Sequence, residues 1–179
     1  MKPIKDMSQG ELGAFVQTHL RNIGIDLVLS GGASVSIYST EKYVSRDLDL
    51  VNIYSVSFGK IKNSMIEIGF IEEGRYFKHP DTLFLVEFPP GPLTIGEEPV
   101  NRIDEIEFST GILKIISPTD SVKDRLSAYY HWGDNQCLVQ ATLICMENDI
   151  DLDEVRRWSA AEGKLDEFSK IHSKLSDNG

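Results

Sequence analysis

Two aspartates separated by one leucine, Asp47 and Asp49, have the type and spacing of metal-binding side chains. They lie in the segment 46–51, RDLDLV, where polar and apolar residues alternate as in a half-buried β-strand. Side chains two positions apart on a strand point to the same face, so both carboxylates face one point while Leu48 and Leu50 face the core. Two like charges this close favour a divalent cation between them. The alternative is the solvent-facing side of an edge strand.

A third carboxylate, Glu87, stands alone among the apolar residues of the run 83–88, LFLVEF. Burying a carboxylate in such a run is costly unless it is paired or bound to a metal. If this strand lies beside that of Asp47 and Asp49, the three carboxylates form one metal site. The alternative is a salt bridge between Glu87 and a nearby cation. The candidate cations are Arg75, Lys78 and Arg102.

A glycine pair after a short apolar run predicts an anion-binding turn. The run 25–29 is typical of a short buried strand. Ser30, Gly31 and Gly32 follow it and lead into a short helical pattern. Glycine lets a backbone approach a ligand closely, and free N–H groups at a helix N-terminus attract phosphate. Ser34, in the first helical turn, could add a hydroxyl, although a glycine pair alone is also typical of an ordinary turn.

The patterns around these residues predict an α+β fold, a small mixed sheet flanked by helices, with a C-terminal helical part. Period-two segments predict further strands at 75–78, 103–109 and 112–116. Apolar residues at helical spacing predict helices at 9–22, 58–69, 119–131, 134–147, 152–161 and 164–175. We therefore expect an α/β core, residues 1–117, with the helical part, residues 118–179, packed on it.

Composition and charge exclude some classes of protein. The 179 residues contain no apolar run near the roughly 20 that a membrane span needs, and the first residues lack the apolar core of a secretory signal. We therefore expect a cytoplasmic protein without a membrane partner. The net charge of −10 repels nucleic acid unless a local basic patch overrides it. Cys137 and Cys145 are expected to be buried, reduced thiols.

In their order along the chain, these pieces resemble the DNA-polymerase-beta-like nucleotidyltransferase superfamily over about residues 25–90. The segments that carry the resemblance are LVLSGGASVSIY, SRDLDLV and LFLVEF. Within that superfamily the chain looks most like the small bacterial proteins that include the minimal nucleotidyltransferases and the AbiEii-type toxins. There a Gly-Gly turn precedes the pattern Ser-x-Asp-(Ile/Leu)-Asp, which is Ser45 to Asp49 in this sequence.

The resemblance implies Mg²⁺-dependent transfer of a nucleoside monophosphate from an NTP to a hydroxyl of an RNA, a protein or a small molecule. Asp47 and Asp49 would hold two Mg²⁺ ions, and Glu87 would share the second ion or deprotonate the attacking hydroxyl. It also implies a bacterial toxin–antitoxin or defence role with a protein partner. The residues implied to bind the nucleotide's phosphates are Ser30, Gly31, Gly32 and Ser34.

A looser resemblance covers the segment 117–126. AbiEii-type proteins carry a helix there whose lysine faces the nucleotide, followed by an acidic residue. The matching positions are Lys123, as a catalytic and nucleotide-binding residue, and Asp134, which would fix Lys123. A helical lysine is also commonly only solvated. The aromatic residues 129–132 would either stack on a base or pack between helices.

Two other functions agree with the same residues. One is a non-catalytic binding or regulatory module that keeps the fold, and the other is a Mg²⁺-dependent phosphohydrolase. Carboxylates that converge in the fold would favour an enzyme, whereas carboxylates on different faces would leave only the binding module.

Overall fold

The structure, a computed structural model, describes residues 2–54, 56–100 and 102–176, so the outer limits of the two predicted parts, residues 1 and 179, lie outside it. In these residues a seven-stranded mixed sheet has the strand order β3-β4-β5-β2-β1-β9-β8. The predicted α+β fold is confirmed, and the chain is helical from Pro118 to Ser176 apart from short connections.

The central strands bring the predicted site segments together. β1 (Leu27–Ser30) pairs antiparallel with β2 (Asp47–Asn52), and β2 pairs parallel with β5 (Leu85–Glu87). The sheet continues to β4 (Tyr76–Lys78) and β3 (Ile71–Glu73) on one side. On the other side β1 pairs parallel with β9 (Gly111–Ile116), which forms a hairpin with β8 (Ile103–Phe108), close to the two predicted strands.

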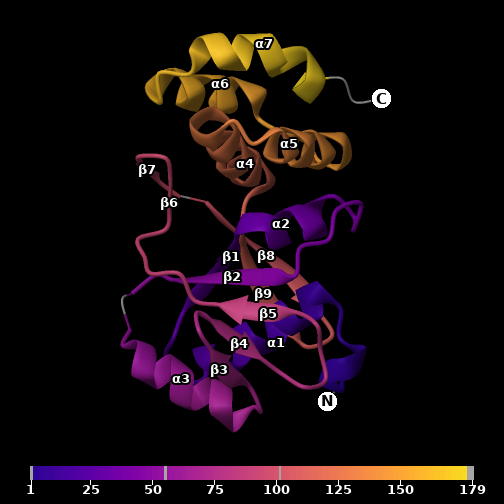
Figure 1. The fold of residues 1–179 in the computed structure, drawn as a ribbon, viewed down its shortest axis with the longest axis vertical. Coiled ribbons are helices and arrows are strands. Elements are labelled where there is room, and N and C mark those ends of the chain that lie inside the picture. The colour runs from indigo at the N-terminus through magenta and orange to yellow at the C-terminus, as the bar shows by residue number, and fades with distance from the viewer. Residues whose placement is uncertain (1, 55, 101, 177–179) are drawn as a thin grey trace.

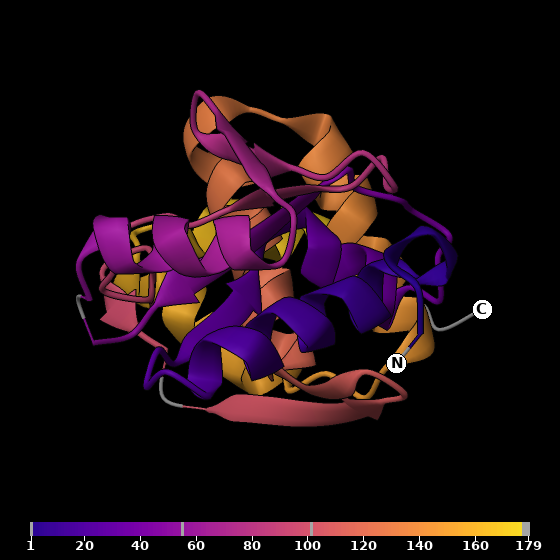
Figure 2. The ribbon, with the colours of Figure 1, turned by 90° about the horizontal axis from the view of Figure 1, so that it is seen from below.

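Two helices cover one face of this sheet, and the rest of the helical chain covers the other (Figures 1 and 2). α1 (Gln9–Arg21) and α3 (Phe58–Glu67) lie on the first face. Leu48 and Leu50 are fully buried, as their alternation with the aspartates predicts. The opposite face of β2, with both aspartates, is therefore turned towards α2 (Gly31–Tyr38) and the C-terminal helices.

Local signals set the helix ends. Ser8 and Glu11 form a capping box at the start of α1. Ser117 caps α4 (Pro118–Trp132), whose first residue is a proline, a residue well suited to that position. Gly133, in the left-handed conformation, ends the same helix. The remaining helices are α5 (Asn135–Glu147), α6 (Leu152–Ala161), α7 (Leu165–Ser176) and the short 3-10 helix Ile4–Asp6.

A small hairpin, β6 (Thr94–Ile95) and β7 (Glu98–Pro99), lies in the chain between β5 and β8 and contacts the helical part. It was not predicted from the sequence. The indole nitrogen of Trp158, a fully buried side chain of α6, donates a hydrogen bond to the carbonyl of Ile95. Tyr130 stacks on Trp158, so the helix-packing interpretation is correct for this aromatic residue. Trp132, in contrast, is 85% exposed.

Cys137 and Cys145 are buried and free, as expected. None of the helices in the described residues has the length and apolar character required to cross a bilayer.

Candidate functional site

Four residues form a row across adjacent strands of the sheet. Ser30 of β1 is opposite Asp49 of β2, Asp49 is in register with Glu87 of β5, and Glu87 is opposite Tyr76 of β4. Paired residues of neighbouring strands point to the same face and lie about 5 Å apart. Asp47, two residues before Asp49, shares that face. The sheet therefore brings the three predicted carboxylates to one surface.

The glycine turn packs directly against this row. Gly31 has φ +67°, and a Cβ atom added there would lie 2.1 Å from Oδ2 of Asp49. A Cβ atom at Gly32 would lie 3.0 Å from Oγ of Ser45. Glycine is needed at Gly31 both for the left-handed conformation and for the close contact. The start of α2 and the carboxylates therefore belong to one site.

Burial and neighbouring negative charges raise the pKa of Asp49 to about 6. Burial is the largest cause, followed by the charges of Glu87 and then Asp47. The charge of Asp124 in α4 raises this pKa further, whereas its ion-pair partner Arg125 has a smaller effect in the opposite direction, because a positive charge favours the ionised carboxylate. The cationic side chains of the described protein thus compensate this group only in part, which is typical of a binding site for a cation.

Glu87 already has a partner. Its carboxylate Oε2 lies 3.5 Å from Nε of Arg75, which is one of the cations that the sequence offered as alternatives to a metal. Among the described residues, no three His, Cys, Asp or Glu side chains are arranged so that they could hold a metal ion as they stand. The three carboxylates share a face, but Glu87 is oriented towards Arg75.

The carboxylates nevertheless fit a divalent cation by their chemistry. Asp47, Asp49 and Glu87 offer hard oxygen ligands, which Mg²⁺ prefers. Burial, and then the neighbouring carboxylates, raise the pKa of Asp49, and a bound cation would favour its ionised form. In the structure Glu87 contacts Arg75, and this contact would have to break before Glu87 could bind a cation.

The hydroxyl of Ser34 points away from the turn surface. Ser34 is fully buried, donates to the carbonyl of Gly31 at 2.7 Å and lies 2.6 Å from Oγ of Ser121 in α4. The hydroxyl thus joins α2 to α4. The predicted contact between Ser34 and a phosphate oxygen is not available in this arrangement.

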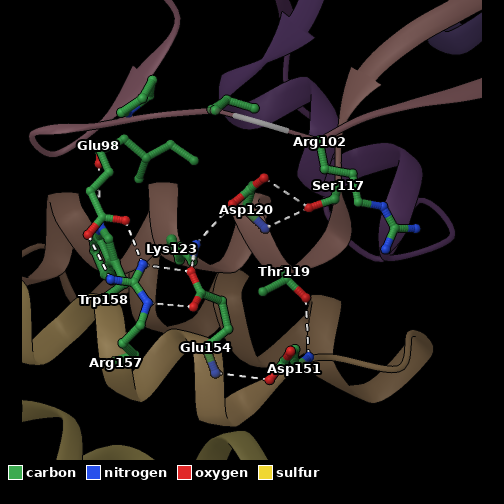
Figure 3. Close-up of a pocket in the computed structure, with 13 residues that line it drawn as sticks. Glu98, Arg102, Ser117, Thr119, Asp120, Lys123, Asp151, Glu154, Arg157 and Trp158 are labelled. Atoms are coloured by element: carbon green, nitrogen blue, oxygen red, sulfur yellow. Dashed lines mark hydrogen bonds and ion pairs between the residues drawn. The ribbon is translucent and has the colours of Figure 1, made fainter.

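Lys123 lies on the opposite side of α4 from the carboxylates. Its Nζ pairs with Glu154 at 2.7 Å and with Asp120 at 3.2 Å, and the side chain is 8% exposed. Figure 3 shows these contacts in a cavity of about 250 Å³ between α4, α6 and the β6–β7 hairpin. The positions 121 and 123 differ by about 200° around a helix, so when Ser121 faces α2, Lys123 faces away. The structure thus does not bring Lys123 to the carboxylates, and its contact with a nucleotide stays a prediction.

Asp134 does not fix Lys123 either. Its carboxylate caps α5 by accepting from the backbone N–H of Gln136 at 2.9 Å, and it accepts from the thiol of Cys137 at 3.3 Å. The sequence supports this position, because aspartate is a preferred residue before a helix. The partners of Lys123 are Glu154 of α6 and Asp120 of its own helix.

The cation that α4 places beside the carboxylates is Arg125, which the sequence analysis missed. It lies about 40° around the helix from Ser121, on the side of α2. Its guanidinium pairs with Asp124, is 17% exposed and donates to Gln140 of α5 at 3.3 Å. Arg125 can be identified from the helical spacing once it is known which face of α4 meets α2. The contact of Ser121 with Ser34 shows that face.

Solved structures match this chain in fold, although no protein-family model and no curated protein matches it in sequence. An antigenic nucleotidyltransferase-like protein from Paracoccidioides brasiliensis matches with a TM-score of 0.63 at 16% identity, over 94% of each chain. The solution structure of the antibiotic-resistance factor ANT(2'')-Ia matches with a TM-score of 0.59 at 14% identity, over 88% of this chain and 92% of the other.

A crystal structure of ANT(2'')-Ia in complex with adenylyl-2''-tobramycin also matches, with a TM-score of 0.55 at 16% identity over 82% of this chain and 92% of the other. The fold is therefore that of the nucleotidyltransferases, as the resemblance of the site segments implied. The finer resemblance to AbiEii-type toxins stays a prediction.

Proposed function

We propose that this chain is a metal-dependent nucleotidyltransferase that moves a nucleoside monophosphate from an NTP to a hydroxyl group of a small molecule. The observation that carries the proposal is the row of Asp49 and Glu87 on adjacent strands, with Gly31 packed against Asp49. The turn that we propose binds phosphates thus lies next to the carboxylates that we propose bind a cation. The nucleotidyltransferase fold of the matching structures supports this interpretation.

In this proposal the chain's own groups bind and orient the reactants. The backbone N–H groups at the start of α2, at Gly31 and Gly32, would bind phosphate oxygens. Asp47, Asp49 and Glu87 would hold Mg²⁺, which supplies charge stabilisation to the entering and leaving oxygens of the displacement when it is bound. Arg125 would add a fixed positive charge beside Asp49.

The reaction balances without a further reactant. The acceptor oxygen forms a bond to the α-phosphorus, and the bond from that phosphorus to the bridging oxygen breaks. Pyrophosphate leaves with the electron pair of the broken bond. Glu87 is the candidate to orient the acceptor hydroxyl and to receive its proton, since its side chain is 20% exposed at the rim of the site.

A small acceptor agrees with the charge of the molecule. The net charge of −10 opposes an RNA acceptor and favours a neutral or cationic one. The matching complex contains an adenylylated small molecule, adenylyl-2''-tobramycin. A toxin–antitoxin or defence role with a protein partner rests on the sequence resemblance alone.

One observation favours a second function, a non-catalytic binding module. Arg75 pairs with Glu87, and the described residues contain no ready-made metal cluster. If that pair persists when nucleotide is present, two carboxylates remain for the metal, and the fold would bind a nucleotide without transferring it.

Product formation tests the proposal. The protein is incubated with Mg²⁺, each of the four NTPs and a panel of polyhydroxylated small molecules that includes cationic aminoglycosides and neutral sugars. The expected result is released pyrophosphate and an acceptor heavier by one nucleoside monophosphate. Asp47→Asn should abolish both, while Asp153→Asn, an exposed position in α6, should retain them. Nucleotide binding without product from any acceptor would favour the binding module.

A further inference from the structure

Arg75 contacts the carboxylate row from the turn between β3 and β4. It directly precedes β4, whose Tyr76 is opposite Glu87 of β5. The guanidinium lies 4.8 Å from the centroid of the Tyr76 ring, donates to the Tyr76 hydroxyl at 2.5 Å, and approaches Glu87 at 3.5 Å. The tyrosine therefore supports the arginine at a position where it contacts a carboxylate of the proposed metal site.

The two partners of this ion pair differ in freedom. The Arg75 side chain is 68% exposed, whereas the Glu87 side chain is 20% exposed and lies on a central strand. Exposed ion pairs contribute little to stability, because water screens the charges and the long side chains lose freedom when they pair. The pair is thus easily broken, and it is the arginine that is free to move into solvent or towards a ligand.

Arg75 and a divalent cation need the same carboxylate. Glu87 cannot serve as a metal ligand in the proposed site while its oxygen faces the guanidinium, and a positive guanidinium at this point also repels the metal. A bound triphosphate would offer Arg75 new partners, because a guanidinium binds phosphate oxygens with two parallel hydrogen bonds.

We propose that Arg75 holds Glu87 in the nucleotide-free protein, and that it transfers to phosphate oxygens of the nucleotide when Glu87 becomes a metal ligand. This inference rests on the proposed function, because it assumes that Glu87 takes part in metal binding. It assigns to Arg75 two effects of opposite sign. The arginine opposes binding of the metal alone and favours binding of the metal–nucleotide complex.

The opposite signs give the test. Mn²⁺, as a spectroscopic substitute for Mg²⁺, is titrated into wild type and Arg75→Gln without nucleotide, with free Mn²⁺ measured by electron paramagnetic resonance. The variant should bind Mn²⁺ about threefold to tenfold more tightly, because it lacks the competing charge. The same variant should bind the Mg²⁺–NTP complex about tenfold more weakly by calorimetry.

Two further variants separate this role from a structural one. Lys78→Gln removes an exposed cation of the same strand, paired with Glu73, and should change neither affinity. Arg75→Lys keeps the positive charge but lacks the planar guanidinium. It should therefore bind Mn²⁺ as weakly as wild type does, and should recover only part of the nucleotide affinity that Arg75→Gln loses. Circular dichroism confirms that each variant is folded.

The outcomes distinguish the inference from the function on which it rests. Wild type that binds Mg²⁺–NTP, with Arg75→Gln binding Mn²⁺ no more tightly than wild type, overturns the inference alone. Wild type that binds neither Mn²⁺ nor any nucleotide overturns both.

Discussion

Asp49 combines burial with negative charge. The carboxylate is enclosed by the glycine turn and lies beside Glu87 and Asp47, and these surroundings raise its pKa to about 6. Arg125 provides partial compensation. A group that is unfavourable for folding in this way is typical of a site that is completed by a ligand.

Asp49→Asn should therefore make the metal-free protein more stable. At pH 8 the amide avoids the cost of the buried charge, and we expect a gain of about 1–2 kcal/mol. This is less than the roughly 3 kcal/mol that corresponds to a rise of the pKa from 3.8 to about 6, because solvent screens part of the effect. The free energy of unfolding is measured with urea for both proteins. If the Asp49→Asn variant were less stable than wild type at pH 8, the claim that the charge of Asp49 destabilises the folded protein would be wrong.

The pH dependence of this difference follows from the direction of the pKa shift. The carboxyl of Asp49 binds its proton more tightly in the folded than in the unfolded chain, where its pKa is about 3.8. The penalty is therefore complete above about pH 6 and disappears as the pH falls towards 4. The advantage of Asp49→Asn should shrink between pH 7 and pH 4, as measured by urea unfolding across that range.

Gly31→Ala tests the contact between the turn and Asp49. The added methyl would meet Oδ2 of Asp49, and alanine is strained at φ +67°, so we expect a loss of about 2–4 kcal/mol in unfolding free energy. Gly59→Ala is the matched control, because a Cβ there meets open space within a helix and should cost nothing. Equal stabilities of the two variants would exclude the close packing at Gly31.

At the scale of the elements, alternation predicts the site better than helical phase does. The period of two in β2 places Asp47 and Asp49 on one face and buries Leu48, and the isolated charge in β5 marks Glu87. The register that puts Asp49 beside Glu87 depends on the order of the strands, which connections far apart in the sequence determine.

The elements that were missed have a physical reason. The strands β6 and β7 have two residues each and β3 has three, so none is long enough to show a period. The roles of the α4 side chains depend on which face of the helix packs against α2. Ser121 marks that face in the structure, but a small polar residue does not predict a buried helix face from the sequence.

The orientation of α4, with Ser121 against α2, predicts different roles for two cations of this helix, Lys123 and Arg125. Lys123→Ala should lower the unfolding free energy by about 2–3 kcal/mol, since it leaves Asp120 and Glu154 without their buried partner, and should change nucleotide affinity less than twofold. Arg125→Gln should weaken binding of Mg²⁺–NTP at least tenfold, because it removes the charge beside Asp49.

Both variants are measured by urea unfolding and by nucleotide calorimetry. If Lys123→Ala lost more nucleotide affinity than Arg125→Gln at the same folded fraction, the sequence-based role of Lys123 would be restored.

At the scale of the whole molecule, the carboxylate row lies on the sheet face that the C-terminal helices cover (Figure 1). The helical part is joined to the sheet by α4 and, through the β6–β7 hairpin, by the pairing of Arg157 with Glu98 and the hydrogen bond of Trp158. Helices and sheet share a single cluster of buried apolar residues. A ligand at the carboxylates would therefore contact both parts.

Calorimetric titration of ATP, GTP, CTP and UTP, each with Mg²⁺, into wild type and into Asp47→Ala/Asp49→Ala tests whether these carboxylates form a nucleotide site. We expect Mg²⁺-dependent binding of at least one nucleotide to wild type and none to the folded double variant. Absence of binding by wild type, or equal binding by both proteins, would contradict a nucleotide site built on these carboxylates.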